Sequence, residues 1–501
     1  MSPARHAPVR GMSGSRRFLG SAVWMAAGNW VEQAVNFAVF VILARLLGAQ
    51  AFGILAMASV VIVLSEFLVR ETFAEGLISA PTVTDGDRNA AFWLLAALGA
   101  ALTLLIVLAA APLAGLYGTP KVEGLILALS PTVVLIALTA VPVAILRRDL
   151  NFRVLSVRAA LGTIAGGVVG IGLALAGFSL WALAGQRLTQ VAVNVTLAWS
   201  AVRWRPGLSV SRADFVRAAR FGGQVAGLRA AELSATQLPV LFLGLTLGPV
   251  ATGLYSLAWR ITEMISFLIV VPLRMVAQPA FAAITREGGR AGRLLADISA
   301  FLGLVAFPLF GGLAAVSFPA ILALFGPTWR PAAPVLALLC IAGAYFSIEK
   351  IQQALCLAAG RAGELTRIAW GNAVLIAAFS FAAAPFGILA VAAGVVAGYL
   401  ILWPLRFRLA ADVAGAPVAA LLRPHLAPLI CALVMAACVA TLLRAVPALR
   451  GDGALAVGIP AGVLVYASLT LVFMPDRLRR LWNALRNPSA TSPETPLTEI
   501  P

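Results

Sequence analysis

Residues 90–117 read AAFWLLAALGAALTLLIVLAAAPLAGLY and contain no charged side chain. A helix rises about 1.5 Å per residue, so about 20 apolar residues cross the roughly 30 Å of hydrocarbon in a bilayer. The quoted stretch therefore predicts a membrane-spanning helix, and thirteen other stretches predict the same. Together the fourteen predicted helices cover residues 18–46, 50–80, 90–117, 122–146, 155–177, 179–201, 214–246, 249–284, 294–320, 332–358, 365–384, 386–410, 425–446 and 453–474.

Arginine accumulates at every second connection between these helices. The two tails and the connections after even-numbered helices hold 26 basic residues, and those after the fourth helix are Arg147, Arg148, Arg153 and Arg158. The connections after odd-numbered helices hold only Lys121, Arg330, Arg444 and Arg450. Short cytoplasmic loops of membrane proteins are enriched in Lys and Arg. The alternation therefore supports the fourteen helices and predicts that both termini lie in the cytoplasm.

The composition excludes several classes of function. Hydrophobic residues make up 61% of the 501 residues and charged residues only 11%, whereas about a quarter of the residues in a soluble domain are charged. The net charge of +17 fits cytoplasmic loops that lie against anionic lipid headgroups, and no basic patch with interleaved aromatic residues predicts nucleic-acid binding. The connections are about 20 residues or shorter, which is too short for an extramembrane catalytic domain, so we expect no enzymatic activity.

Metal and cofactor chemistry are not predicted either. The four cysteines all lie within predicted membrane helices, where they serve as small packing residues; they are Cys340, Cys356, Cys431 and Cys438. His6 and His425 are peripheral, so they form no metal site with Cys or carboxylate neighbours. The chain has no glycine-rich nucleotide-binding loop, so we expect no cofactor and no ATP step. Residues 487–501 are rich in Ser, Thr and Pro and predict a disordered tail.

The chain contains an internal repeat. Leu47, Gly48, Gly53 and Ala58 recur 200 positions later, within residues 247–258, and Glu32 recurs as Glu232. A second similarity relates residues 112–118 to residues 319–326. Six helices separate the copies, so both copies enter the membrane from the same side, as in parallel repeats about an axis along the membrane normal. We therefore predict an all-α polytopic membrane protein with two parallel six-helix repeats and two additional C-terminal helices.

These boundaries predict six segments. They are a basic cytoplasmic tail (1–17), an N-terminal six-helix half (18–201), a cytoplasmic linker (202–213), a C-terminal six-helix half (214–410), two additional membrane helices (411–474) and a partly disordered cytoplasmic tail (475–501). Secondary transporters that are built from such repeats bind the substrate between the halves and rock the halves around it.

Charged residues also lie inside the predicted helices, where each costs about 2.5–3.5 kcal/mol at the bilayer centre on insertion scales. Such residues face protein or water, so we expect a polar cavity between the two halves. The candidate ligands for an anionic substrate are Arg70, Arg229, Arg260, Arg274 and Lys350. The candidates for ion coupling or for charge pairing are Glu32, Glu66, Glu232, Glu263 and Glu349.

The alternative for these charges is a set of ion pairs that only neutralise one another inside the bundle. Glu66 and Arg70 have the i, i+4 spacing of a pair within one helix. Arg45 lies near a helix end, which favours a structural role with the charged group reaching the interface. Arg187 lies apart from the other intramembrane charges.

Several segments resemble one known family. Residues 24–75, with Ala44-Arg45-Leu46-Leu47-Gly48 and Phe52-Gly53, are similar to the start of bacterial polysaccharide transporters, the Wzx-like oligosaccharide flippases. Residues 147–153 resemble the basic-aromatic loop of this family, and residues 248–260 resemble a further family segment. The similarity extends over about residues 17–475. The family belongs to a superfamily that also includes multidrug exporters and peptidoglycan-precursor flippases.

The resemblance implies two six-helix halves around a central cavity in the bacterial cytoplasmic (inner) membrane. It implies alternating-access transport of undecaprenyl-diphosphate-linked oligosaccharide to the outer leaflet, for lipopolysaccharide, O-antigen or exopolysaccharide biosynthesis. It implies no catalytic residue, and Arg260, Arg274 and Lys350 match the cavity arginines of related flippases by placement only. H+ or Na+ are candidate coupling ions, and a polysaccharide polymerase and glycosyltransferases are candidate partners. A cation-coupled exporter of drug-like molecules and a non-transporting scaffold of a polysaccharide assembly complex remain as alternatives.

Overall fold

The structure, a computed structural model, describes residues 13–72, 83–149, 151–208, 212–287, 289–446 and 453–475. The N-terminal basic tail lies largely outside these residues, and the C-terminal stretch predicted as disordered (487–501) lies wholly outside them.

All regular elements among the described residues are helical. The α-helices are α1 (Ser13–Thr72), α3 (Asp85–Leu116), α4 (Lys121–Leu129), α5 (Pro131–Arg148), α6 (Phe152–Leu175), α7 (Leu180–Ala201), α8 (Arg212–Thr246), α9 (Gly248–Arg286), α10 (Gly292–Ala315), α11 (Ser317–Phe325), α12 (Ala332–Ala358), α13 (Ala362–Ala383), α14 (Ile388–Ala414), α15 (Val418–Ala445) and α16 (Gly453–Phe473). Two short 3-10 helices, η1 (Pro327–Trp329) and η2 (Ala384–Phe386), complete the set.

The helices account for the fourteen predicted spans. Eleven stretches of the described residues are long and apolar enough to cross a membrane. One of them lies in α1, which bends at Gly48 (φ 73°, ψ 178°) and so supplies two spans. The helices α7 and α8 are long enough, with 22 and 35 residues, but are more polar than the eleven. The prediction of an all-α, multi-pass membrane protein is confirmed.

Two predicted spans have interruptions that the sequence reading missed. The span predicted at 122–146 consists of α4 and α5, which meet at Ser130 because Pro131 has no backbone N–H to continue the helix. The carbonyl of Leu127, which would have accepted that N–H, accepts the Ser130 hydroxyl instead at 3.0 Å. The span predicted at 294–320 ends with α10 at Ala315, and α11 follows as a separate helix.

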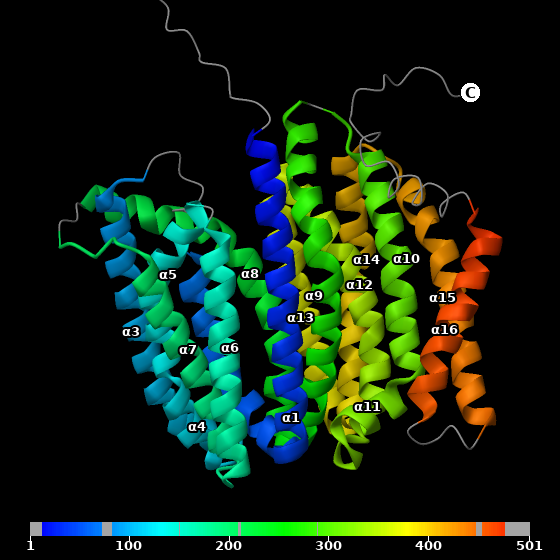
Figure 1. Cartoon of the computed structure of the whole chain (residues 1–501), viewed down its shortest axis with the longest axis horizontal. Helices are drawn as coiled ribbons and strands as arrows, with labels where there is room; N and C mark the ends of the chain where they lie inside the picture. Colours follow the sequence, from blue (N-terminus) through cyan, green and yellow to red (C-terminus); the bar gives the residue numbers. More distant parts are fainter. Residues whose placement is uncertain are drawn as a thin grey trace, which may run out of the picture. The chain divides into compact units, whose positions relative to one another are not determined.

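The chain divides into two compact units. Unit 1 comprises Met1–Leu268, Leu324–Ala342 and Gly360–Arg406, and unit 2 comprises Ile269–Ala323, Gly343–Ala359 and Phe407–Pro501. In unit 1, α6 packs against α1 and α7, α3 packs against α5, and α8 packs against α1 and α13. Figure 1 shows α3, α4, α5, α6 and α7 together as the blue-to-teal part of unit 1.

Unit 2 has a core around α15, which packs against α10 and α16. The buried cluster consists of Val316, Ala320, Met435 and Val439. The hydroxyl of Tyr466 in α16 donates to the carbonyl of Leu304 in α10 at 3.0 Å, which ties these two helices together. In Figure 1, α15 and α16 are the neighbouring orange and red helices.

The helices α6 and α7 approach each other closely because three glycines of α6, at positions 162, 166 and 170, face α7. A Cβ atom added to Gly166 would lie 2.6 Å from the backbone oxygen of Gln186. Small residues at every fourth position allow membrane helices to pack at such short distances. The side chain of Gln190 also donates to the hydroxyl of Thr163 at 3.1 Å. This packing fixes the polar face of α7 inside unit 1.

The two copies of the sequence repeat have the same turn. Gly48 lies between the two segments of α1 with φ 73°, and Gly248 lies between α8 and α9 with φ 76°. Side chains other than glycine rarely adopt this left-handed region. The repeat that the sequence predicts therefore corresponds to a repeated backbone conformation.

The segments that follow these turns touch each other reciprocally, in what we call the glycine contact. A Cβ atom added to Gly53 would lie 1.6 Å from the backbone oxygen of Pro249, and one added to Gly253 would lie 2.1 Å from that of Ala49. Each repeat thus places a glycine against the first helical turn of the other. All four residues belong to unit 1.

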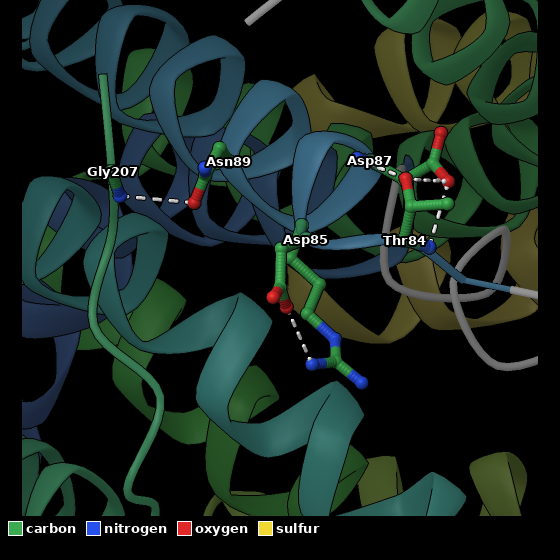
Figure 2. A network of polar contacts seen from close by, with 6 residues as sticks. Thr84, Asp85, Asp87, Asn89 and Gly207 are labelled. Atoms are coloured by element: carbon green, nitrogen blue, oxygen red, sulfur yellow. Dashed lines mark hydrogen bonds and ion pairs between the residues drawn. The ribbon is translucent and has the colours of Figure 1, made fainter. Parts of the chain in front are cut away.

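The start of α3 is capped and also holds the segment after α7 (Figure 2). Thr84 and Asp87 form a capping box, in which the backbone N–H of Asp87 donates to the Thr84 hydroxyl oxygen at 3.2 Å. The backbone N–H of Gly207 donates to the Asn89 side-chain oxygen at 3.0 Å, and the Trp93 indole donates to the Gly207 carbonyl at 2.9 Å. The first part of the predicted linker is therefore bound to α3.

Candidate functional site

Unit 1 contains a cavity of about 270 Å³ among α1, α5, α6 and α7, which we call the N-half cavity. Its charged lining residues are Glu32, Arg70, Arg147, Arg158 and Arg187, and its uncharged polar lining residues are Thr139, Gln190 and Asn194. Among the lining residues that the structure describes, four guanidinium groups therefore share the cavity with one carboxylate. Clustered like charges raise the local electrostatic potential, so this lining favours a bound anion.

The cations reach the cavity from four different helices. Arg70 and Arg147 lie in the last turns of α1 and α5, where the negative end of the helix dipole stabilises a cation. Arg158 lies in the second turn of α6, and its charge interacts with those of Arg70, Arg147 and Glu32. Arg187 approaches from α7. The convergence depends on the packing of the helices and on no single segment of sequence.

Arg187 is neutralised by a buried carboxylate. Its Nη2 atom lies 2.5 Å from Oε2 of Glu66, which is only 5% exposed. The other carboxylate oxygen of Glu66 accepts the Thr132 hydroxyl at 2.8 Å. The prediction that Glu66 pairs with Arg70 within one helix is therefore wrong, since tertiary packing brings Arg187 closer. The same pair explains why an arginine occurs in α7, apart from the other intramembrane charges.

Two polar atoms of the lining have no hydrogen-bond partner among the described residues. These are Nε of Arg158 and the side-chain oxygen of Asn194, and both atoms are buried. Buried polar groups are nearly always hydrogen-bonded to protein, water or ligand. The unsatisfied donor of Arg158 therefore marks a position where an anion or ordered water fits.

The size of the cavity limits what it can hold. Small-molecule sites usually have volumes of about 300–1,000 Å³, so a cavity of about 270 Å³ accommodates a phosphate-sized or diphosphate-sized group but not an oligosaccharide. Among the described residues there is no cluster of three His, Cys, Asp or Glu side chains that could hold a metal ion. The chemistry that this lining offers is anion binding.

Four further predicted charges of unit 1, Arg229, Glu232, Arg260 and Glu263, lie outside the lining. Arg229 pairs with Glu232 one turn along α8, with an Nη1 to Oε2 distance of 3.1 Å, as the ion-pair alternative predicts. Arg260 in α9 is exposed, and its guanidinium carbon lies 4.5 Å from the ring centre of Phe40. The charge of Arg260 also interacts with those of Glu263 and Arg187.

The remaining candidates belong to unit 2. Lys350 lies 3.6 Å from Oε2 of the adjacent Glu349 and donates to the side-chain oxygen of Gln353 at 3.2 Å. Arg274 is half-buried in α9. The structure thus places only Arg70 and Glu32, of the ten candidates, in the N-half cavity.

Sequence reasoning missed three cations of this site. Arg147 and Arg158 count only as cytoplasmic-loop residues in the charge pattern. Arg147 directly follows the helix predicted at 122–146, and Arg158 is counted with the connection although it lies inside the helix predicted at 155–177. Arg187 lies apart from the other charges, although Gln190 and Asn194 follow it at i+3 and i+7 on the same face of α7. That polar stripe in a membrane helix is the signal that could have identified the cavity.

The fold is that of a known class of transporters. A structure of the lipid II flippase MurJ in an inward closed conformation matches with a TM-score of 0.74 and 15% identity, over 91% of this chain and all of that chain. An inward-facing multidrug resistance transporter of the MATE family, in the MOP superfamily, matches with a TM-score of 0.56 and 18% identity, over 80% of this chain and 96% of that chain. At these identities the likeness shows the fold alone.

Sequence comparison identifies more specific relatives. The succinoglycan biosynthesis transport protein ExoT of Rhizobium meliloti (strain 1021) is 28% identical over 64% of this chain, and the match spans 64% of the length of ExoT. The lipopolysaccharide biosynthesis protein WzxC of Escherichia coli (strain K12) is 25% identical over 70% of this chain and 72% of its own. The family model described as "Polysaccharide biosynthesis protein" matches residues 42–334, more than half of the chain. The chain therefore belongs to this family of polysaccharide biosynthesis proteins, as its resemblance to Wzx-like transporters predicts.

Proposed function

We propose that this protein is a flippase that moves undecaprenyl-diphosphate-linked oligosaccharide across the bacterial cytoplasmic membrane by alternating access. Membership of the polysaccharide biosynthesis protein family supports the proposal. So do relatives named for succinoglycan transport, lipopolysaccharide biosynthesis and teichuronic acid biosynthesis. The exported material would serve exopolysaccharide, lipopolysaccharide or O-antigen synthesis.

The single observation that carries the proposal is the cationic N-half cavity inside a membrane-spanning bundle. A diphosphate group cannot enter hydrocarbon without a large desolvation cost. Guanidinium groups replace the lost hydration with charge-assisted hydrogen bonds, for which arginine is well suited. The volume of about 270 Å³ fits the diphosphate, so the prenyl chain remains in lipid and the sugars extend out of the cavity.

The orientation of the chain decides which leaflet supplies the substrate. We place both termini and the connection between α5 and α6 in the cytoplasm, as the positive-inside rule predicts. Arg147 and Arg158 flank that connection, so the diphosphate meets them first from the inner leaflet. The N-terminal half (18–201) and the C-terminal half (214–410) would then rock around the bound headgroup.

Transport in this scheme uses no nucleotide. Glu32 is the one carboxylate among the described residues that line the cavity, and it lies near the charge of Arg158. We assign it the role of the group that exchanges H+ or Na+ while the anion is released. Glycosyltransferases that make the lipid-linked oligosaccharide, and a polymerase that consumes it, are the expected partners.

The test compares two arginines of the same helix. Arg158→Gln removes a cavity cation, whereas Arg153→Gln changes an exposed arginine of α6 that does not line the cavity. A lost charge-assisted contact of about 1.5–3 kcal/mol corresponds to roughly 10- to 150-fold slower transport. Cells that lack the wild-type gene and express Arg158→Gln should accumulate lipid-linked oligosaccharide on the inner leaflet, although the variant protein is present in the membrane at its normal amount. Cells that express Arg153→Gln should not.

Two results would reject the proposal. One is wild-type transport of lipid-linked oligosaccharide by both Arg158→Gln and Arg70→Gln. The other is that these variants produce a normal amount of polysaccharide but lose resistance to cationic drugs, which would identify an exporter of drug-like molecules.

A further inference from the structure

Four aromatic residues of unit 1 form a cluster that we call the aromatic plug. It consists of Phe40, Phe52, Phe325 and Trp329. Phe40 packs edge-on against Phe52 and Phe325, with ring centres 5.6 Å apart in both pairs. Trp329 is fully buried and packs edge-on against Phe52 at 5.8 Å. The plug therefore joins both segments of α1 to α11 and η1.

Hydrogen bonds hold the plug together at its edges. The indole N–H of Trp329 donates to the carbonyl of Ala44 at 3.0 Å. The Nε atom of Arg45 donates to the carbonyl of Leu324 at 2.7 Å. The glycine contact lies near the same bend of α1, at Gly48, because Gly53 follows Ala44 by only nine positions. Packing and hydrogen bonding together close this end of unit 1.

Arg260 lies on the side of the plug that faces away from the Gly48 turn. Phe40 lies eight residues before Gly48, and Arg260 lies twelve residues after the equivalent Gly248, so both are about 12–18 Å along their helices from the turns. The guanidinium of Arg260 covers one face of the Phe40 ring, while the residue itself is exposed. Its charge also interacts with that of Arg187, which lines the N-half cavity. Arg260 therefore contacts the plug and is within electrostatic range of a cation of the cavity.

The contact of Arg260 with Phe40 is one that an anion can compete for. A cation over an aromatic face is held by the ring quadrupole, which is a weaker attraction than a charge-assisted hydrogen bond to phosphate. A phosphate that engages Arg260 from its exposed side draws the guanidinium away from the ring. Phe40 then loses one of its three packing partners and the plug is weakened.

We propose that Arg260 makes opening of this end conditional on an anionic headgroup, because the same guanidinium binds the phosphate and holds Phe40 in the plug. Arg260 is thus a specificity-determining residue. A neutral lipid that enters the bundle leaves the plug closed, and a diphosphate-bearing lipid releases it. This inference rests on the proposed function, from which it takes the chemical class of the substrate.

The experiment measures exposure of the plug in the full-length protein in phosphatidylethanolamine and phosphatidylglycerol nanodiscs. The four native cysteines are replaced by alanine and a reporter Ala44→Cys is introduced, since Ala44 is fully buried in the closed plug. The rate of labelling by a polar maleimide then reports opening. Ala51→Cys, also buried at this end, is a second reporter in case the first disturbs packing, and Val250→Cys, which is half exposed, should label at a constant rate.

Undecaprenyl diphosphate should raise the labelling rate at least fivefold, and undecaprenol, which lacks the charge, should leave it unchanged. Phe40→Leu keeps an apolar side chain without the π face, so it should label fast even without ligand. Arg260→Gln should also label fast without ligand and should show no response to undecaprenyl diphosphate.

Retention of the ligand response in Arg260→Gln, or slow labelling of Phe40→Leu without ligand, would overturn the inference. A thermal-shift measurement separates this failure from failure of the proposed function. If undecaprenyl diphosphate stabilises the wild type but does not change labelling, only the inference on Arg260 is rejected. If it does not stabilise the wild type at all, the proposed function fails as well.

Discussion

The substitution Gly53→Ala should prevent closure of the end of unit 1 that contains the glycine contact. The added Cβ atom would lie 1.6 Å from the backbone oxygen of Pro249, and ordinary contacts of this kind begin at 3.4 Å. The two backbones must therefore separate by roughly 1.8 Å, the difference between these distances. A backbone oxygen cannot turn aside as the end of a flexible side chain can, so the separation requires the helices themselves to move.

Overpacking of this kind typically costs about 1–3 kcal/mol. Here the cost falls on the closed arrangement alone, because it vanishes once the two segments part. The ratio of closed to open molecules should therefore decrease by roughly 5- to 150-fold. We expect fast labelling of the Ala44→Cys reporter without ligand, and a loss of oligosaccharide transport of similar size.

A matched control is available within the same unit. Gly115 lies inside α3, and a Cβ atom added there meets no atom within 4 Å. Gly115→Ala should leave labelling and transport unchanged and should stabilise the helix by up to about 1 kcal/mol. If Gly53→Ala labels as slowly as Gly115→Ala and transports normally, the glycine contact is not a closing element.

Three further predictions concern stability, measured by unfolding in detergent. Glu66→Gln should destabilise the protein by about 2–3 kcal/mol, which is somewhat less than for a fully buried ion pair because the Arg187 side chain is 36% exposed. A double-mutant cycle with Arg187→Gln should give a coupling energy of at least about 1 kcal/mol, and a coupling energy near zero would contradict the ion pair. Thr84→Ala should cost about 1 kcal/mol through loss of the α3 cap, and Thr84→Ser should restore most of it; equal stability of the two variants would exclude capping. Trp329→Phe should cost about 1–3 kcal/mol, because the buried carbonyl of Ala44 loses its donor, and an unchanged midpoint would mean that water replaces the indole.

The properties that the sequence predicts correctly are those that depend on one helix at a time. Apolar length depends on the thickness of the bilayer, which acts on each segment independently. The repeat is also visible in the sequence alone, and its paired glycines, Gly48 and Gly248, have similar positive φ angles of 73° and 76°. The interruption at Ser130 was missed although Pro131 is visible in the sequence, because proline is also tolerated within membrane helices.

The partners of the charges could not be predicted because they depend on packing between distant helices. Two arginines are candidate partners of Glu66: Arg70 on the same helix and Arg187, which is 121 positions away in the sequence. The structure pairs Glu66 with the distant one, Arg187. Nothing in local spacing favours Arg187, because its approach depends on the glycines of α6 that hold α7 close. The same packing places Arg147 and Arg158, which the charge pattern assigns to a loop, in the lining of the cavity.

The charges of the N-half cavity suit reversible binding better than maximal affinity. Among the described residues, four guanidinium groups line it, and two carboxylates, Glu32 in the lining and Glu66 behind Arg187, offset part of their charge. A bound diphosphate offsets more of that charge, which lowers the cost of holding the guanidinium groups in a low-dielectric interior. A more cationic cavity would bind the headgroup more strongly but would also retain it, whereas conduction requires a site that the substrate can leave. The carboxylates therefore contribute to turnover, because they limit an attraction that arginines alone would make too strong for release.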